Sequence, residues 1–395
     1  MSSTHIYQFA KTIQEIASKH RQHIHRHPEI AFQELQTADY VARILVALGF
    51  EVKRGFGKTG LVATLPAQSE GPRFLLRFDM DALAVTEQTG LDFASTKAGF
   101  MHACGHDGHV AIGLTVAKVV ADMKNELPGS YYLVFQPAEE IGQGAAAMIA
   151  DGVLDFIRPD YALAVHLWAE EPAGWLGITP GPVMAGSKDL CIKVHGVGGH
   201  SARPHKAIDP IVASAHLITA LQSIVSRKID PLESGVYSIT QIHAGSTINV
   251  IPDCVTMSGT PRYFTPEVEA EIETSTKRIC EGIAEAFGCE IEVNLGVNAP
   301  PLVNNPAVCQ AADAAARMVN PEFVIEKNLR MMASEDMALF LQRVPGAMFF
   351  IGAGKDDPES RFPLHHPRFD IDESSLVTAA TLLLETCKQL ANTTA

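Results

Sequence analysis

Apolar residues along the chain follow helical and strand periods in turn. Near the N-terminus they fall on one face of a predicted helix, at Ile6, Phe9, Ile13, Ile16 and Ala17. A second helix is predicted over about 34–48, ending at Gly49. Short apolar runs with the length of buried strands follow at 60–65, 74–78, 131–135 and 161–165, with a helix predicted at 108–123. This alternation predicts an α/β fold with a mostly parallel central sheet and helices on both faces.

The order of elements changes near residue 186. From there the pattern predicts strand, helix, strand, strand, helix and strand, at 190–194, 210–226, 236–243, 254–259, 267–287 and 290–295. This β-α-β-β-α-β order is that of a ferredoxin-like domain. Pro266 and Gly288 bracket the second of these helices in the positions where proline and glycine are favoured.

The α/β pattern returns after residue 300. A helix is predicted near 306–318, a strand at 347–351 and a final helix at about 373–390. We therefore predict one larger domain made of residues 1–186 and 298–395, with a smaller domain of residues 187–297 inserted into it.

Composition narrows the class of protein. The 395 residues suggest two or three domains at about 150 residues each. A net charge of −14 argues against a nucleic-acid partner, because phosphate is bound by cations. No apolar run reaches the roughly 18 residues of a membrane span, so no membrane association is expected. The N-terminus lacks the pattern of a secretory signal, and the seven cysteines are scattered, which favours a reducing compartment, the cytoplasm.

One segment, residues 102–109, is dense in potential metal ligands. Its sequence, HACGHDGH, holds three histidines, a cysteine and an aspartate. Cysteine and histidine are the side chains that a zinc-like ion prefers. Gly105 and Gly108 would let the backbone bend around a small object. We interpret the segment as a metal-binding loop.

Other chemically active residues follow predicted strands. Taken singly, each has an ordinary explanation, such as a capping aspartate, a solvated loop or a partly buried histidine. The carboxyl ends of parallel strands share one edge of a sheet, however, and ligands gather there. We therefore expect one cluster of seven residues at that edge: Asp81, Cys104, His106, Glu139, Glu140, His166 and His365.

This set suggests a reaction. One cysteine, three histidines and one glutamate can fill the coordination of two metal ions. Two ions about 3.5–4 Å apart polarise a carbonyl and generate hydroxide at neutral pH, and the remaining glutamate would be the general base. The predicted inserted domain adds a glycine-rich basic segment at 196–205, together with Asn249 and Arg262. Their side chains are donors suited to an oxyanion and a carboxylate. The alternative interpretation of the segment is a loose turn.

The motifs resemble, over nearly the whole chain, the dinuclear metallopeptidase family of aminoacylases and carboxypeptidases. Within it they are similar to the branch of hippurate hydrolases, N-acyl-amino-acid amidohydrolases and auxin-conjugate hydrolases. The motifs that carry the resemblance are His25-Arg26-His27-Pro28-Glu29, Glu34, Asp79-Met80-Asp81-Ala82-Leu83, residues 102–109, residues 136–140, residues 198–202, residues 249–252, Ser334-Glu335-Asp336 and His365-His366-Pro367. The resemblance implies a zinc-exopeptidase-like fold in which residues 187–297 form a lid and dimerisation domain.

The resemblance also implies roles for single residues. The ligands of two divalent ions, Zn, Mn, Co or Ni, would be Cys104, His106, Glu140, His166 and His365. Glu139 would be the general base, and Asp81 would fix the geometry of the ligands. In a homodimer, His200 and Asn249 would reach the partner subunit's active site to stabilise the oxyanion. Arg262 would hold the carboxylate of the substrate.

The implied reaction is hydrolysis of the amide bond of N-acyl-L-amino acids, with a small-molecule substrate. Three alternatives stay open: a dipeptidase or carboxypeptidase with the same site, a cysteine hydrolase and a non-catalytic metal or peptide binder. The cysteine hydrolase would use Cys104 with His106 or His166. Residues 104 and 106 lie two apart in a tight loop, a poor arrangement for a nucleophile and its base.

Overall fold

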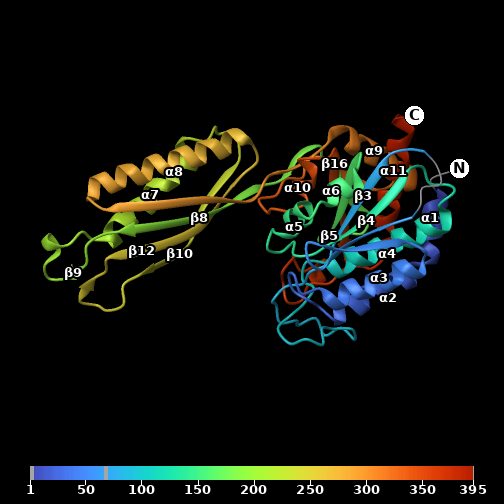
Figure 1. Cartoon of the computed structure of the whole chain (residues 1–395), viewed down its shortest axis with the longest axis horizontal. Coiled ribbons are helices and arrows are strands. Elements are labelled where there is room, and N and C mark those ends of the chain that lie inside the picture. The colour runs from blue at the N-terminus through green and yellow to red at the C-terminus, as the bar shows by residue number, and fades with distance from the viewer. Residues whose placement is uncertain (1–3, 66–69, 395) are drawn as a thin grey trace. The chain divides into compact units, whose positions relative to one another are not determined.

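The computed structural model describes residues 4–65 and 70–394, and the chain packs into two compact units (Figure 1). The larger unit comprises the residues up to Val183, Val303–Leu329 and the residues from Asp336 onward. The smaller unit comprises Met184–Leu302 and Arg330–Glu335. The sequence-based division assigned 330–335 to the larger domain, and here the structure differs.

The larger unit is built on an eight-stranded sheet with the order β1-β2-β4-β3-β5-β16-β6-β15. Its strands are β1 (Glu51–Phe56), β2 (Gly60–Thr64), β3 (Arg73–Asp79), β4 (Ser130–Gln136), β5 (Tyr161–Pro172), β6 (Trp175–Gly177), β15 (Val324–Glu326) and β16 (Gly346–Gly354). The central strands β4, β3, β5 and β16 are parallel, as predicted. β1 and β2 pair antiparallel with their neighbours, and β6 pairs antiparallel with β16 and parallel with β15. The apolar runs did not reveal β1, β6 and β15, because β1 is largely exposed and the other two have three residues each.

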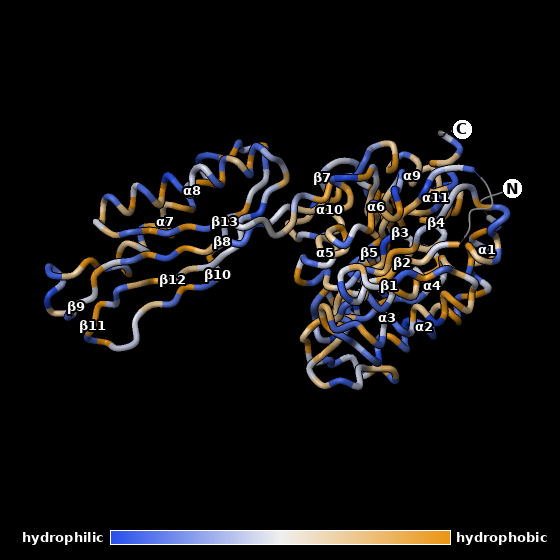
Figure 2. Tube along the Cα trace, in the orientation of Figure 1, coloured by the Kyte–Doolittle hydropathy of each residue, from blue (hydrophilic) through white to orange (hydrophobic). Residues whose placement is uncertain are grey.

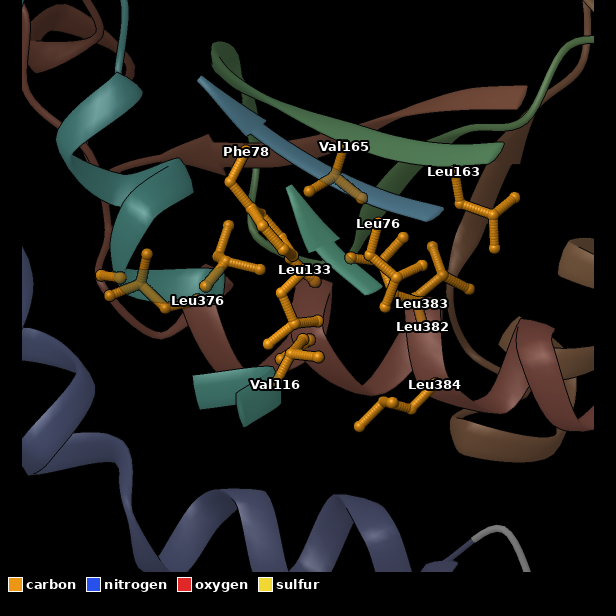
Figure 3. Packing of buried hydrophobic residues seen from close by; sticks show 14 of the residues in the cluster. Leu76, Phe78, Val116, Leu133, Leu163, Val165, Leu376, Leu382, Leu383 and Leu384 are labelled. Carbon is orange, nitrogen blue, oxygen red and sulfur yellow. The ribbon is translucent and has the colours of Figure 1, made fainter. Parts of the chain in front are cut away.

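Helices cover both faces of this sheet. They are α1 (Thr4–Thr12), α2 (Gln14–Arg26), α3 (Leu35–Ala47), α4 (His106–Met123), α5 (Gly144–Ala150), α6 (Val153–Ile157), α9 (Pro306–Val319), α10 (Ala338–Leu341) and α11 (Ser375–Thr394). Figure 3 shows Phe78 and Leu133 of the sheet facing Val116 of α4 and Leu383 of α11. Alternation along β3 points Arg77 to the opposite face, where it is also buried. Burial on both faces is typical of strands in parallel sheets.

The smaller unit has the predicted ferredoxin-like order. In chain order its main elements are β8 (Gly186–His195), α7 (Pro210–Arg227), β10 (Gly235–Ala244), β12 (Cys254–Tyr263), α8 (Pro266–Phe287) and β13 (Glu290–Ala299). The strands form an antiparallel sheet in the order β10-β12-β8-β13. Figure 2 shows hydrophobic and hydrophilic residues alternating along α8, as in a helix with one face on a sheet.

Local sequence signals explain the bounds of the helices in the smaller unit. The Asp209 carboxylate accepts hydrogen bonds from two backbone N–H groups at the start of α7. The Thr265 hydroxyl accepts one hydrogen bond from a backbone N–H group at the start of α8. Gly288, with φ +66°, ends that helix. These are the residue types favoured at helix ends, so the sequence placed both helices to within a residue or two.

Residues 330–335 join the smaller unit through hydrogen bonds. The backbone N–H of Ala185 donates to the carbonyl oxygens of Met331 (3.0 Å) and Ala333 (2.9 Å). Arg262 Nη1 donates to the carbonyl oxygen of Met332 at 2.8 Å. The segment forms no helix or long strand, so apolar periodicity could not show where it packs.

Short elements complete the described structure. They are β7 (Gly181–Met184), β9 (Gly199–His200), β11 (Val250–Ile251), β14 (Leu302–Asn304) and the 3-10 helices η1 (Pro204–Lys206) and η2 (Pro358–Ser360). β9 pairs with β11, and β7 pairs with β14. None of the helices within 4–65 and 70–394 has the length and apolar composition needed to cross a bilayer.

Candidate active site

The ends of three adjacent parallel strands supply the framework of the site. β3 ends at Asp79 and β4 ends at Gln136, so Asp81 and the Glu139–Glu140 pair follow directly. His166 lies within β5, the neighbour of β3. Gly105, with φ +86°, turns the preceding loop into α4, whose first residue is His106. A residue with a Cβ would be strained at this φ, so glycine suits the position.

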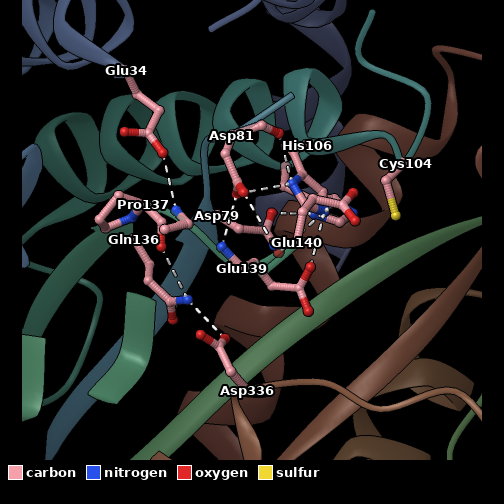
Figure 4. A network of polar contacts seen from close by, with 12 residues as sticks. Glu34, Asp79, Asp81, Cys104, His106, Gln136, Pro137, Glu139, Glu140 and Asp336 are labelled. Carbon is pink, nitrogen blue, oxygen red and sulfur yellow. Dashed lines mark hydrogen bonds and ion pairs between the residues drawn. The ribbon is translucent and has the colours of Figure 1, made fainter. Parts of the chain in front are cut away.

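Potential metal ligands converge in two overlapping groups. Cys104, His106 and His166 offer ligand atoms that all lie within 4.8 Å of one another, and the same holds for Cys104, Glu140 and His365. Cys104 Sγ lies 3.7 Å from His166 Nε2, and Glu140 Oε2 lies 3.4 Å from His365 Nε2. Such spacings are those of atoms that share one ion with bonds of about 2.0–2.3 Å. Figure 4 shows Cys104, His106 and Glu140 gathered beside the loop that carries Glu139.

Hydrogen bonds fix which nitrogen of each histidine faces the cluster. His106 Nδ1 donates to the carbonyl oxygen of Asp81, and His166 Nδ1 donates to that of Leu167, each at 2.9 Å. Both rings therefore direct Nε2 toward the cluster, which makes this the nitrogen available to a metal ion. In His109, Nε2 accepts from the Leu167 N–H at 3.0 Å and Nδ1 donates to Asp79 at 2.5 Å. His109 thus supports the site with both nitrogens already engaged.

The buried donors fit a pair of divalent cations. His106 Nε2 and Glu140 Oε1 are buried and have no hydrogen-bond partner among the residues the structure describes. Burial raises the pKa of the Glu140 carboxyl to about 7, and it raises the pKa of the Cys104 thiol well above its ordinary value. Burial also lowers the pKa of His166. A divalent ion offsets the burial penalty on carboxylate and thiolate, and it binds neutral imidazole.

Asp81 holds the loop that carries the two glutamates. Its carboxylate oxygens accept from the backbone N–H groups of Glu139 and Glu140, each at 3.0 Å. The preceding residue, Ala138, has φ +54°, and its N–H donates to Glu34 Oε1 at 3.0 Å (Figure 4). The tight turn brings the Glu139 carboxylate to 3.9 Å from His106 Nε2. Asp81 and Glu34 together hold this turn in place.

His365 comes from a distant loop. It has φ +66°, an uncommon backbone conformation for histidine, and its N–H donates to the carbonyl oxygen of Ala103 at 2.7 Å. That bond ties the loop to the residue before Cys104. The side chain is 55% exposed, so His365 lies on the open side of the cluster.

A second buried polar cluster supports the first turn of α4. Asp107, next to His106, accepts hydrogen bonds from Arg21 Nε at 3.1 Å and from His25 Nδ1 at 2.8 Å. His25 Nε2 lies 3.2 Å from Glu87 Oε1. Although burial disfavours the charged imidazole, the Asp107 and Glu87 carboxylates raise the pKa of His25 to about 9. His25 is therefore a structural cation.

This raised pKa predicts a pH-dependent stability. The folded value of about 9 exceeds the ordinary 6.5, so the contribution of His25 is fully present below 6.5 and is lost as pH rises through 9. The loss amounts to about 3 kcal/mol. Urea unfolding of wild type and His25→Gln across this range should show a pH-dependent difference. The exposed His205 provides the control, since His205→Gln should leave the wild-type profile unchanged; an equal profile in His25→Gln would contradict the assignment.

The remaining predicted site residues belong to the smaller unit. His200 pairs with Val250 in the β9–β11 ladder, and the Ser201 N–H donates to the Asn249 carbonyl oxygen at 3.1 Å. His200 and Asn249 are therefore neighbours, and both are exposed. Arg262 is half-buried on β12, where its Nη1 donates to Met332 and Ser334. The roles of these three residues stay predictions.

The sequence did not reveal one buried network beneath the site. Arg77, 1% exposed, donates to Asp79 at 2.5 Å, to Gln136 at 2.9 Å and to Asp336 at 2.9 Å. A charged residue inside the apolar strand FLLRFD was the available signal, because a buried arginine requires partners. Its partners could not be identified from periodicity.

The fold and the site define a class of protein. Buried thiol, imidazole and carboxylate donors at the strand ends of a parallel sheet, with a further carboxylate beside them, are typical of metal-dependent hydrolases. Residues 75–389 match the model of a protein family described as "Peptidase family M20/M25/M40". The chain belongs to this family. The protein is thus a hydrolase of the metallopeptidase type.

Similar proteins cover almost the entire chain. A probable hydrolase of Synechocystis sp. is 42% identical over 92% of this chain and 92% of its own length. The hippurate hydrolase of Campylobacter jejuni is 40% identical, over 92% of this chain and 93% of its own. Among solved structures, a dinuclear metal-binding M20 peptidase from Bacillus subtilis is 32% identical with a TM-score of 0.84, covering 97% of this chain and 99% of that one.

Proposed function

We propose that the protein hydrolyses the amide bond of N-acyl-L-amino acids, releasing a carboxylic acid and a free amino acid. The observation that carries this proposal is the convergence of five potential ligand side chains from separate segments of the chain, with the Glu139 carboxylate beside them. The name of the C. jejuni relative adds support, since hippurate is an N-acyl amino acid, N-benzoylglycine.

The five ligands in this proposal are Cys104, His106, Glu140, His166 and His365. They would hold two divalent ions, of Zn, Mn, Co or Ni. The similar B. subtilis structure is described as a dinuclear metal-binding peptidase, which supports this number of ions. Such a pair, when bound, polarises a carbonyl and lowers the pKa of water. The cysteine favours an ion of intermediate softness.

Glu139 moves the proton in this mechanism. Its carboxylate accepts a proton from the attacking water, and it later donates that proton to the nitrogen of the leaving amino acid. Asp81 accepts a hydrogen bond from the Glu139 N–H at 3.0 Å. The backbone that carries the Glu139 carboxylate is therefore already in place before the reaction begins. The C–N bond breaks as the proton arrives, which gives a neutral amine as the leaving group.

The smaller unit supplies substrate recognition in this proposal. His200 and Asn249 act in a homodimer, where they stabilise the oxyanion in the partner subunit's active site. Arg262 binds the carboxylate of the amino acid. Its Nη1 already donates to Met332 and Ser334, so the other guanidinium nitrogens would bind this carboxylate. A dipeptidase or carboxypeptidase activity on short peptides would use the same site, and the family description favours it as the second candidate.

A substrate screen with metal analysis tests the proposal. Protein purified without chelator should hold two divalent ions per chain by elemental analysis. With Zn²⁺, Mn²⁺ or Co²⁺ added, it should hydrolyse members of a panel of N-acetyl, N-benzoyl and longer N-acyl L-amino acids in preference to dipeptides. Preference for dipeptides would favour the second candidate, and no hydrolysis of any compound would indicate a non-catalytic binder.

A further inference from the structure

Asp336 is a buried carboxylate that the mechanism above does not use. It belongs to the Ser334-Glu335-Asp336 motif and is 1% exposed. Its Oδ1 accepts from Gln136 Nε2 at 2.7 Å and from Arg77 Nη2 at 2.9 Å, and its Oδ2 accepts from the Ala145 N–H at 2.9 Å. One side chain from late in the chain therefore gathers three donors, two of which flank the glutamate loop.

Two of these donors mark the ends of loop 137–143. Gln136 is the last residue of β4, directly before the loop, and Ala145 lies in the first turn of α5, directly after it. The ends also approach each other, since the Gly144 N–H donates to the Ala138 carbonyl oxygen at 3.1 Å. A Cβ at Gly144 would lie 1.6 Å from the Pro137 carbonyl oxygen, so the approach requires glycine. Asp336 thus joins both ends of the loop.

The middle of the same loop carries Glu139 and Glu140, which Asp81 holds by their N–H groups. Figure 4 shows Asp81 and Asp336 on two sides of the loop. Carboxylate oxygens of Asp336 and Glu139 lie within 4.8 Å of each other. Asp81 therefore fixes the part of the loop that faces the ligands, and Asp336 fixes its base.

The third donor extends the network to β3. Arg77 bridges Asp336 and Asp79, and Asp79 in turn accepts from His109 and lies 3.7 Å from His106 Nε2. All these charges are buried, and a buried guanidinium between two carboxylates has little freedom to move. The ends of β3 and β4, which precede Asp81 and Glu139, are thereby fixed to each other.

We propose that Asp336 is a positioning residue for catalysis: its carboxylate holds the base of loop 137–143 and so sets where Glu139 and Glu140 lie. This inference rests on the roles proposed for the two glutamates. It does not place Asp336 in contact with substrate or metal. A displacement of about 1 Å at a reacting group can cost about 100-fold in rate, so loss of the charge should act on kcat.

The test compares Asp336→Asn, Gln136→Met and the double variant. Asp336→Asn should lower kcat about 10–100-fold with KM nearly unchanged. Because Asp336 and Gln136 hold the same end of the loop through their mutual hydrogen bond, the double variant should lose less activity than the product of the two single losses, whereas independent effects would multiply. Glu385→Gln is a matched control: Glu385 is a buried carboxylate on α11 in the same unit, its ion-pair partner is Lys388 (3.4 Å), and its replacement should leave kcat within about 2-fold.

A readout without substrate separates this inference from the proposed function. The visible absorption spectrum of the Co²⁺-loaded protein reports the geometry of Glu140 as a ligand, and it should change in Asp336→Asn while two Co²⁺ ions remain bound. If wild type hydrolyses no compound, the proposed function fails and the spectrum still decides the inference. A wild-type spectrum with wild-type kcat in Asp336→Asn would overturn it, as would multiplying effects in the double variant. If Asp336→Asn does not fold, Gln136→Met decides alone: a lower kcat supports the inference and a wild-type kcat overturns it.

Discussion

Replacing Glu139 with glutamine is expected to remove turnover while both metal ions stay bound. Glutamine preserves the size of the side chain and leaves the backbone N–H on which Asp81 acts. It cannot accept a proton from water or return one to the leaving nitrogen. The expected loss in kcat is about 10²–10⁴-fold, the usual contribution of one positioned acid or base. Steady-state kinetics with elemental analysis of the same preparation will measure it.

The adjacent glutamate provides the matched control. Glu140→Gln alters the proposed ligand that lies 3.4 Å from His365 Nε2, so this variant should lose metal as well as activity. The two neighbouring substitutions therefore have different signatures, one with full metal content and one without. Full activity in Glu139→Gln would defeat its assignment as the general base.

Removal of the metal ions should reduce hydrolysis to background. Chelation by EDTA followed by dialysis removes the ions that the cluster binds, and with them the two cations that would polarise the carbonyl in the proposed reaction. Adding Zn²⁺, Mn²⁺ or Co²⁺ should restore the activity. Recovery, together with an unchanged circular dichroism spectrum, shows that the protein stayed folded throughout.

The same experiment separates the metal-dependent reaction from a cysteine hydrolase. Cys104 is 6% exposed and burial raises the pKa of its thiol, which is the opposite of what a nucleophilic cysteine requires. The exposed Cys191 would react first with an alkylating reagent, so the assay uses Cys191→Ser. With metal bound, the activity of this variant should survive treatment with the alkylating reagent. Activity that survives complete removal of metal would support the cysteine mechanism.

Much of the fold follows from local pattern. The apolar runs of β3, β4 and β5 and the capped helices α7 and α8 carry their own signals, since strand burial and helix ends depend on nearby residues. The parallel order of those strands then brings their carboxyl ends to one edge. For this reason the strand pattern alone predicts that Asp81, Glu139 and His166 lie at the same edge of the sheet.

The remaining parts of the site depend on contacts between distant segments. Asp336 meets Gln136 across 200 positions of sequence, and Arg77 across 259. No periodic pattern encodes such a pairing, because neither partner lies in an element whose face predicts the other. His109 shows the reverse case: it belongs to the ligand-rich segment, yet Asp79 and the Leu167 N–H occupy both of its nitrogens.

The placement of residues 330–335 has a consequence for dissecting the molecule. The backbone passes between the two units four times, after residues 183, 302, 329 and 335. A fragment trimmed to 184–302 would leave the Ala185 N–H without its carbonyl acceptors at Met331 and Ala333, and Arg262 without that at Met332. An independently expressed ferredoxin-like fragment therefore needs this hexapeptide restored, for example by fusing it through a short linker after residue 302.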